Sequence, residues 1–252
     1  MLKDISSPSK NKVFQSNELI EAHYKQEYSV QEQRTILWII SEIHRKNYFS
    51  KRANKYCEPS LVIRITAKDY AKLMNIPVKN VYRDAQKISR NLMEKVIKIE
   101  NKNGWKMFHW VSSMEYINQE AVIEATLTND IIPYIIDLER YTEFKLENIL
   151  YINSSHAIKI YQLLAQYKTS GERTISITDL RSILGISNLK TYEWYGAIKQ
   201  RILEISKREI NKKTDLTISY SEIKNGRKVE AIKFKITQKT TQETKSDEAV
   251  ST

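Results

Sequence analysis

The sequence predicts an α+β protein built from two consecutive domains that repeat one order of helices and strands. One observation is a repeat: IRITAKDYAKLMNI at residues 63–76 returns in shortened form as ISITDLRSILGI at residues 175–186. Another is that helical and strand periodicities alternate along a chain with only 5 glycines and 4 prolines. The length of 252 residues, 41% of them hydrophobic, is enough for one large core or two of ordinary size.

The first copy opens with a helix expected over residues 29–46. Ser29 and Glu32 have the spacing of a capping box, in which each side chain accepts a hydrogen bond from the other residue's backbone N–H. Apolar residues then recur at helical spacing and supply a broad buried face. Apolar and polar residues alternate at residues 63–66, which predicts a short strand.

A capped helix and a longer helix come next. Thr66 is expected to be the N-cap of the first, with Asp69 in the first turn near the positive end of the helix dipole. This helix should stop at Ile76-Pro77, because a residue before proline avoids the α conformation. The longer helix is expected over about residues 78–95. Its apolar stripe consists of Val81, Ala85, Ile88 and Leu92.

A β-hairpin is predicted to close the first copy. The segments VIKIE at residues 96–100 and WKMFHWV at residues 105–111 flank the turn signal NKNG. Lys102 and Lys106 would give this hairpin a basic tip.

The second copy repeats this order. A helix at residues 154–168 precedes a strand at residues 174–177, and Thr178 is expected to cap a helix that Gly185 ends. A long helix then starts near Lys190. Its inward residues should be Tyr195, Ile198, Ile202 and Ile205.

A last hairpin turns at Asn225-Gly226, and its second strand directs Ile232, Phe234 and Ile236 inward. The two copies align with an offset of 112 residues at Thr66 and Thr178, but with an offset of 110 from Asp69 and Asp179 onward. We therefore expect a two-residue change inside the capped helix.

Helix, strand, capped helix, turn, longer helix and hairpin is the order of a winged helix-turn-helix. The sequence thus predicts two tandem winged helix-turn-helix domains related by internal duplication. The capped helix braces the longer one, whose outer side can enter a major groove about 12 Å wide, and the hairpin, or wing, can reach the DNA backbone. We expect domains at residues 17–143 and 144–238, the second being the main sequence-specific reader, with flexible tails at residues 1–16 and 239–252.

Polar residues on the outer side of the longer helices and at the tip of the second wing are the candidates for DNA contact. Arginine can pair with guanine, asparagine and glutamine with adenine, and lysine with phosphate. The candidates are Lys79, Asn80, Arg83, Gln86, Lys87, Arg90, Lys190, Tyr192, Trp194, Lys199, Gln200, Arg201, Arg208, Lys224, Arg227 and Lys228. Alternatively, a basic helix face is merely solvated, Trp194 belongs to a core, and Tyr82 and Tyr192 pack instead of binding phosphate.

The charge balance favours a polyanionic partner. There are 41 Lys and Arg against 30 Asp and Glu, a formal net charge of +11, which leaves DNA, ribosomal and membrane-surface partners open. Cys57 is the only cysteine, so no intramolecular disulfide can form. No apolar run approaches the roughly 18 residues of a membrane span, and the first residues have no signal-peptide pattern, so we expect a cytoplasmic protein.

No residue pattern indicates catalysis, a metal or a cofactor. The chain lacks a phosphate-binding loop motif, and its 4 histidines are far apart in sequence. An acidic group could suggest a two-metal nuclease, but alternating acids are normal on the solvent face of strands. This group is Glu115, Glu120, Glu124 and Asp130. We expect a DNA-binding protein that is not an enzyme and needs no cofactor or metal.

Residues 191–236 resemble the C-terminal winged helix of iteron-binding plasmid replication initiators. The motifs are Arg201-Ile202-Leu203, Glu209-Ile210-Asn211 and the wing KNGRKVEAIKF, and the resemblance extends more loosely over residues 17–238. It implies that both domains dock on one origin repeat and that monomers start replication with a host initiator and helicase. It also implies that dimers repress the protein's own gene. Lys199-Gln200-Arg201 departs from the family's arginine-rich centre, which leaves the base preference there open.

Strands within residues 107–128 exceed what a minimal wing needs. They are either a surface that pairs across a dimer axis or an ordinary extended sheet. Two other functions stay open: a transcriptional repressor with two winged helices and no replication role, and a metal-dependent nicking enzyme.

Overall fold

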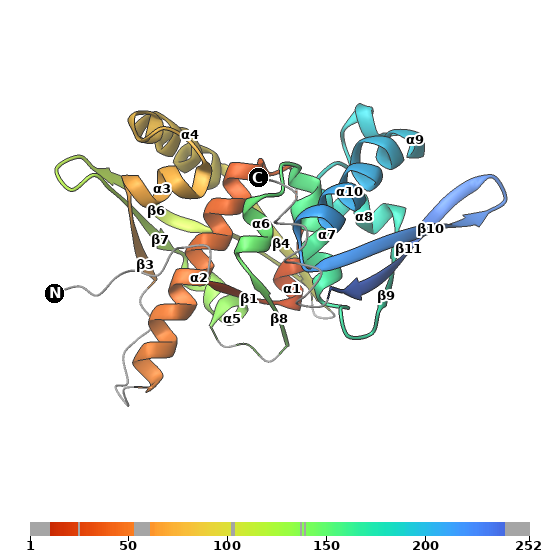
Figure 1. Cartoon of the computed structure of the whole chain (residues 1–252), viewed down its shortest axis with the longest axis horizontal. Helices are drawn as coiled ribbons and strands as arrows, with labels where there is room; N and C mark the ends of the chain where they lie inside the picture. The colour runs from red at the N-terminus through yellow and green to blue at the C-terminus, as the bar shows by residue number, and fades with distance from the viewer. Residues whose placement is uncertain are drawn as a thin grey trace. The chain divides into compact units, whose positions relative to one another are not determined.

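The chain forms two compact units of mixed α+β structure. The computed structural model describes residues 11–24, 26–52, 61–101, 104–136, 138 and 140–239. Unit 1 contains the residues up to Ala22 together with Ser29–Leu150, and unit 2 contains His23–Tyr28 together with the residues from Tyr151 onward (Figure 1). We call His23–Tyr28 the strap, because this short N-terminal segment packs with the C-terminal part of the chain.

Unit 1 combines a long helix with a capped helix pair and several antiparallel strands. Its elements are β1 (Lys12–Ser16), α1 (Asn17–Ile20), α2 (Val30–Arg52), β3 (Val62–Thr66), α3 (Ala67–Met74), η2 (Val78–Asn80), α4 (Val81–Glu94), β4 (Val96–Asn101), β5 (Gly104–His109), β6 (Val111–Ile117), β7 (Val122–Leu127), η3 (Asn129–Ile131), α5 (Ile132–Ile135), β8 (Tyr141–Lys145) and α6 (Glu147–Leu150).

The N-terminal segment is more ordered than its composition indicates. Lys12–Ser16 was expected to belong to a flexible tail but forms β1, which pairs antiparallel with β8, Val13 lying opposite Phe144. The expectation was wrong because local composition does not report a strand partner about 130 residues away. The other residues of the two expected tails, apart from Asn11 and Lys239, lie outside the described residues.

The capping box at the start of α2 is confirmed. The backbone N–H of Ser29 donates to Glu32 Oε2 at 2.9 Å, and the N–H of Glu32 donates to Ser29 Oγ at 3.2 Å. The helix continues to Arg52 instead of ending near residue 46, because no proline or glycine stops it there.

The capped helices of the two units begin in the same way. In α3, Thr66 Oγ1 accepts from the Asp69 N–H at 3.1 Å, as expected. In α8 (Ile177–Leu184), Ser176 Oγ accepts from the Asp179 N–H at 3.0 Å, so the expectation that Thr178 caps this helix was wrong. An N-cap lies three residues before the acidic residue at the third helical position, and that spacing selects Ser176.

With Ser176 as the N-cap of α8, the capped helices of the two units align at a single sequence offset. Thr66 and Ser176 are 110 residues apart, and so are the residues that end the two helices, Asn75 with φ 55° and Gly185 with φ 72°. The expected two-residue change inside the helix is therefore absent. Asn75, in the left-handed conformation, ends α3 before Ile76-Pro77, where we expected the stop.

Alanine substitutions at the two candidate caps of α8 test this register. Ser176→Ala should lower the free energy of unfolding by about 1 kcal/mol, because the Asp179 N–H loses its acceptor. Thr178→Ala should be neutral or slightly stabilising, because Thr178 is an exposed residue inside the helix and alanine has the higher helix propensity. Urea unfolding followed by circular dichroism measures both, and a larger loss in Thr178→Ala would contradict the assignment.

Sheet topology shows which hairpin is the wing of unit 1. The strand order is β3-β7-β6 in unit 1, and in unit 2 it is β9-β11-β10, formed by β9 (Glu172–Ser176), β10 (Leu216–Asn225) and β11 (Lys228–Gln238). In both units the strand before the capped helix pairs with the second strand of a hairpin. The wing of unit 1 is therefore β6–β7.

The expectation that residues 96–111 form the first wing was wrong. Their segments do form a hairpin, with β4 and β5 paired from Val96 opposite His109 to Asn101 opposite Gly104, but it is an additional one. Two hairpins in a row have the same local alternation, and only pairing with β3 distinguishes them. The interpretation of residues 107–128 as an ordinary sheet is confirmed for β7, which has β3 on one side and β6 on the other.

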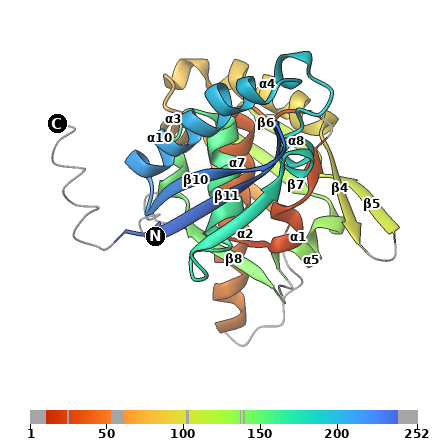
Figure 2. The same cartoon turned by 90° about the vertical axis from the view of Figure 1, so that its right-hand side faces the viewer.

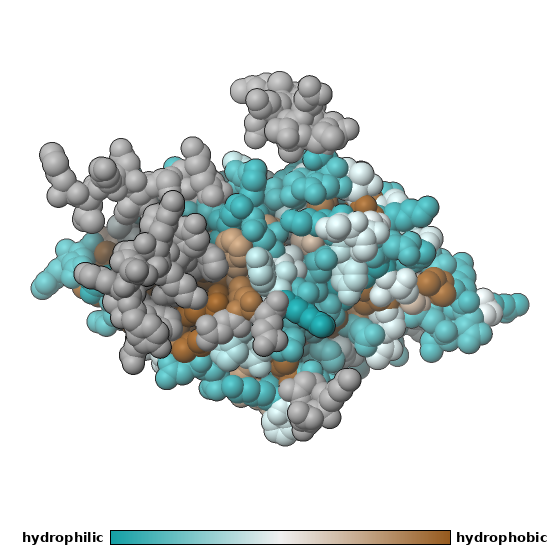
Figure 3. Space-filling view, turned by 90° about the horizontal axis from the view of Figure 1, so that it is seen from below, coloured by the Kyte–Doolittle hydropathy of each residue, from teal (hydrophilic) through white to brown (hydrophobic). Residues whose placement is uncertain are grey.

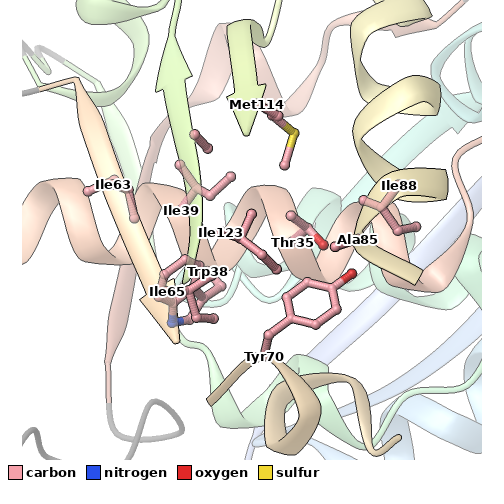
Figure 4. A pocket seen from close by; sticks show the side chains of 11 residues that line it. Thr35, Trp38, Ile39, Ile63, Ile65, Tyr70, Ala85, Ile88, Met114 and Ile123 are labelled. Atoms are coloured by element: carbon pink, nitrogen blue, oxygen red, sulfur yellow. The ribbon is translucent and has the colours of Figure 1, made fainter. Parts of the chain in front are cut away.

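The core of unit 1 lies where α2, α3, α4 and the β3-β7-β6 sheet meet. Figure 4 shows side chains from these elements that line one small cavity. Among them are Thr35, Ile39, Ile65, Tyr70, Ala85 and Ile123. They enclose about 10 Å³, no more than one water-sized space, so the packing of this core leaves no room for a larger ligand.

In unit 2 the helix α7 is followed by β9, further helical segments and a long hairpin, and Figure 2 shows the three strands of its sheet side by side. Besides the strands and α8, its elements are β2 (His23–Tyr24), α7 (Ser155–Ala165), η4 (Lys190–Tyr192), α9 (Tyr195–Ile198), η5 (Lys199–Leu203) and α10 (Glu204–Lys213). As expected, Ile232, Phe234 and Ile236 of β11 are buried.

The long helix of unit 2 is interrupted by a π-helical turn, η5. Buried residues follow one another at a spacing of four, at Ile198, Ile202, Ser206 and Ile210. An α-helix has 3.6 residues per turn, so the wider turn absorbs the extra residue. Tyr195 and Ile205 were expected to face inward but are only half-buried. Ile205 follows the π turn, which rotates the inward side of the helix toward Leu203 and Ser206, whereas the Tyr195 hydroxyl donates to Glu222 of β10.

On the face seen in Figure 3, hydrophilic residues cover most of the described surface. Within the described ranges, no helix is both long and apolar enough to cross a membrane.

Candidate nucleic-acid interface

The outer side of α4 in unit 1 presents polar and basic side chains to solvent. Its inner stripe is buried as expected, at Val81, Ala85, Ile88 and Leu92. The opposite side contains exposed Arg83, Gln86, Lys87 and Arg90, and none of these four has an ion-pair or hydrogen-bond partner within the described part of the chain. Lys79 is exposed and Asn80 is half-buried in η2, just before α4.

Polar contacts from the core hold the inner side of α4 in place. The Tyr70 hydroxyl of α3 donates to Asp84 Oδ2 at 2.9 Å, and Asn91 Nδ2 donates to Glu32 Oε1 of α2 at 2.7 Å. Burial, together with the charge of Asp84, raises the pKa of Tyr70, so this hydroxyl stays a donor at neutral pH. The exposed polar side chains of α4 therefore project from a helix that contacts with the core hold in place.

Tyr82 lies at the start of α4 and is 52% exposed. Its ring meets Tyr116 of β6 edge-on, with centroids 5.2 Å apart. The side chain therefore packs against the wing on one side and is open to solvent on the other.

The candidate recognition helix of unit 2, the counterpart of α4 in unit 1, is the run α9, η5 and α10. Gln200 and Arg201 are exposed on the π turn, and Arg208 is exposed on α10. Lys190 is exposed in η4. These four residues have no ion-pair or hydrogen-bond partner among the described residues.

Two aromatic residues predicted to contact DNA, Tyr192 and Trp194, precede this helix in the sequence. Trp194 is 77% exposed, so it lies on the surface and not in a core. Tyr192 is half-buried and meets His156 of α7 edge-on, with ring centroids 5.6 Å apart. Tyr192 therefore packs, while Trp194 is open to a partner.

Arg181 of α8 fixes the turn that contains these aromatics. Its Nη2 atom donates to the carbonyl oxygens of Tyr192 at 3.0 Å and Glu193 at 2.6 Å. The turn precedes Trp194 directly, so Arg181 positions the entrance to the recognition helix. Our sequence reasoning missed it, although an arginine in the last turn of the capped helix was visible.

The wing of unit 2 ends in an exposed basic tip. Lys224, Arg227 and Lys228 are all exposed around a two-residue loop. Gly226, the first loop residue, has φ 59°, a conformation that glycine adopts most easily in such a turn. Basic side chains at an exposed tip can bind the DNA backbone.

The wing of unit 1 has the opposite charge. No lysine or arginine lies between Val111 and Val122, and Glu120 is at its tip. Arg64 of β3 pairs with two carboxylates of this wing, its Nε lying 2.6 Å from Glu124 Oε2 and its Nη1 3.3 Å from Glu120 Oε2. The expectation of a basic first tip was therefore wrong. Lys102 lies outside the described residues, and Lys106 pairs with Asp130 at 2.8 Å.

Lys199 lies beside the second wing instead of pointing into open solvent. Its Nζ is 2.8 Å from Glu222 Oε1 on β10, and Lys224 Nζ is 3.1 Å from Glu222 Oε2. Hydrogen bonds from Lys199, Tyr195 and Lys224 lower the pKa of Glu222 to about 2, so Glu222 is ionised at neutral pH. Alternation along β10 gave no signal that this glutamate faces the helix.

The described residues contain no group of three or more His, Cys, Asp and Glu side chains placed to hold a metal ion. Three of the acidic residues considered for a two-metal site, Glu115, Glu120 and Glu124, lie near the guanidinium of Arg64. Glu120 and Glu124 pair with Arg64, and Asp130 pairs with Lys106.

Comparison with known proteins identifies two winged-helix domains in this chain. The family model described as Initiator Replication protein, WH1, matches residues 12–165, and that described as Initiator Rep protein, WH2, matches residues 176–236. A replication initiation protein of Escherichia coli is 22% identical over 231 residues, covering 89% of this chain and 69% of that protein. An uncharacterized 27.6 kDa protein of Escherichia coli is 23% identical over 223 residues, covering 84% of this chain and 90% of its own.

Among solved structures, the Pi initiator protein in complex with iteron DNA has the same fold. Its TM-score is 0.64 at 20% sequence identity, over 90% of this chain and 97% of that chain.

Proposed function

This chain belongs to the family of initiator replication proteins with WH1 and WH2 winged-helix domains, and we propose that it initiates plasmid replication by binding directly repeated origin sequences, or iterons, as a monomer. One observation carries the proposal. Each unit directs a row of arginine and glutamine side chains outward from the helix that follows its capped helix, and these side chains have no partner within the described protein. The Pi initiator, whose structure contains iteron DNA, supports the choice of ligand.

Two recognition helices on one chain can read two major grooves about 10 to 10.5 base pairs apart, so a bound repeat should span about two helical turns. Base discrimination would come from Arg83 and Gln86 in one groove and from Gln200 and Arg201 in the other, because these side chains match purine edges. Arg227 and Lys228 at the tip of the second wing would add affinity without sequence preference. Because the first wing is acidic, unit 1 would depend on α4 for its DNA contacts.

Several bound copies would then bend the origin and strain an adjacent A·T-rich segment, which a host initiator and helicase would use for loading. A homodimeric form would repress the gene of the initiator itself. We place this activity in the cytoplasm, where plasmid DNA resides. Relatives of this family are DNA-binding initiators and not classical enzymes, and we infer no cleavage of DNA by this chain.

An origin-dependent replication assay with the purified full chain tests the proposal. The template is a supercoiled plasmid with the DNA that flanks the gene, and the control is the same plasmid with its direct repeats scrambled. We expect replication and tight binding only with intact repeats. Binding to a lone inverted repeat without replication would favour a transcriptional repressor, and nicking of the plasmid with Mg²⁺ or Mn²⁺ would favour a nicking enzyme.

A further inference from the structure

A groove in unit 2 separates the recognition helix from the wing. Its volume is about 490 Å³, and it is open to solvent. Three lysines and two glutamates line it: Lys199, Lys207, Lys224, Glu204 and Glu222. A groove of this composition beside a basic wing tip would be expected to attract phosphate groups of any DNA sequence.

Glu222 opposes that attraction. One of its oxygens, Oε1, accepts hydrogen bonds from the Tyr195 hydroxyl at 2.9 Å and from Lys199 at 2.8 Å, while Oε2 is 3.1 Å from Lys224. The side chain of Glu222 is only 17% exposed, whereas the two lysines are about half exposed. Both lysines therefore form ion pairs with a carboxylate that also accepts a hydrogen bond from Tyr195 of α9.

The second glutamate of the groove has a different environment. Glu204 Oε1 accepts a hydrogen bond from the Tyr220 hydroxyl, and no lysine pairs with it among the described residues. The two carboxylates line one groove, but among the described residues only Glu222 forms ion pairs with lysines of the groove. One of these lysines, Lys199, directly precedes the candidate base-reading residues Gln200 and Arg201.

We propose that Glu222 is a specificity-determining residue that withholds Lys199 and Lys224 from DNA phosphates and so suppresses sequence-independent binding. This inference rests on the proposed function. A phosphate that entered the groove would meet the carboxylate and would have to break two ion pairs. Binding to a random sequence depends on phosphate contacts alone. The pairing of Lys199 and Lys224 with Glu222 therefore lowers the affinity for random DNA most. The correct repeat gains its affinity from base contacts at Gln200 and Arg201 and loses less.

Glu222→Gln tests the inference because it removes the charge and keeps the shape of the side chain. Each phosphate neutralised by a freed lysine steepens the dependence of log K on log salt by about 0.9. Two freed lysines should therefore steepen the slope for a random 30-base-pair duplex by up to about 2. Affinity for that duplex in low salt should rise by about tenfold, and the ratio of specific to random affinity should fall.

Glu204→Gln is the matched control, since it also removes one negative charge from the groove. It should change the salt slope by less than about 0.5, because it frees no lysine. An equal steepening in both variants would overturn the inference in favour of a general charge effect. Circular dichroism and thermal unfolding of both variants establish that the fold is intact.

A double-mutant cycle separates this role from a merely structural one. Lys199→Ala should have little effect on random-duplex affinity in the native chain, but it should cancel about half of the gain in the Glu222→Gln background. Equal effects of Lys199→Ala in both backgrounds would overturn the inference even if the proposed function held. If the native chain binds no duplex in low salt, the proposed function itself fails.

Discussion

Replacing Arg201 by alanine should lower the affinity for an origin repeat by about 5- to 150-fold, while affinity for a random duplex changes by less than about threefold. The expected loss corresponds to the 1 to 3 kcal/mol that one bidentate contact with a base contributes. Arg201 is exposed on the π turn and has no ion-pair partner within the described residues, so its guanidinium can reach a guanine edge. Fluorescence anisotropy with the two duplexes at fixed salt measures both affinities.

Lys228→Ala is the matched control at the wing tip. Lys228 is exposed next to the loop of the hairpin, where it can bind phosphate but is not placed on the helix that reads bases. This variant should weaken binding to both duplexes by a similar factor and reduce the salt slope by about 1. If Arg201→Ala lowered both affinities equally, Arg201 would be a phosphate contact and our assignment would be wrong.

Replacing Gly185 by alanine should lower the free energy of unfolding of unit 2 by about 2 to 4 kcal/mol. Gly185 ends α8 with φ 72°, where a residue with a Cβ costs about 1 kcal/mol or more. A Cβ there would also lie 2.6 Å from the carbonyl oxygen of Gln26 and 2.7 Å from its carbon. These are backbone atoms of the strap, so the clash adds about 1 to 3 kcal/mol of overpacking.

Asn75→Ala provides the control for Gly185→Ala. Asn75 occupies the equivalent end of α3 with φ 55° but is exposed, so its replacement by alanine should cost only the conformational part, about 1 kcal/mol. Chemical unfolding with a probe in each unit would give the two losses. Equal losses would show that the close approach of the strap does not destabilise Gly185→Ala.

Local signals predicted the local features of this fold. The capping box at Ser29, the N-cap at Thr66 and the end of α8 at Gly185 are confirmed, because each depends on residues within about four positions of one another. The inner stripe of α4 and the three inward residues of β11 are confirmed for the same reason.

Features that depend on distant partners were not predictable from local pattern. β1 exists through pairing with β8, and the wing of unit 1 is identified by the pairing of β7 with β3. Two consecutive hairpins have similar alternation, so the wrong one was chosen. The acidic residues of the true wing were therefore noticed but not assigned to a wing, and their partner Arg64 was missed.

The interface was predictable as a set of residues but not in its internal contacts. The sequence marked the outer faces of α4 and of η5–α10 correctly as exposed, because a buried stripe leaves the other side to solvent. It could not show that Lys199 turns toward Glu222, because the two residues are 23 positions apart and on different elements. The π turn that rotates Leu203 and Ser206 inward likewise has no simple sequence signal.

Missing-base interference on one origin repeat tests most directly whether both units read DNA. The native chain should give two groups of interfering bases with centres about 10 to 10.5 base pairs apart. Arg83→Ala should weaken one group and Arg201→Ala the other, because the two arginines belong to different recognition helices. A single group, or loss of the same group in both variants, would contradict the account.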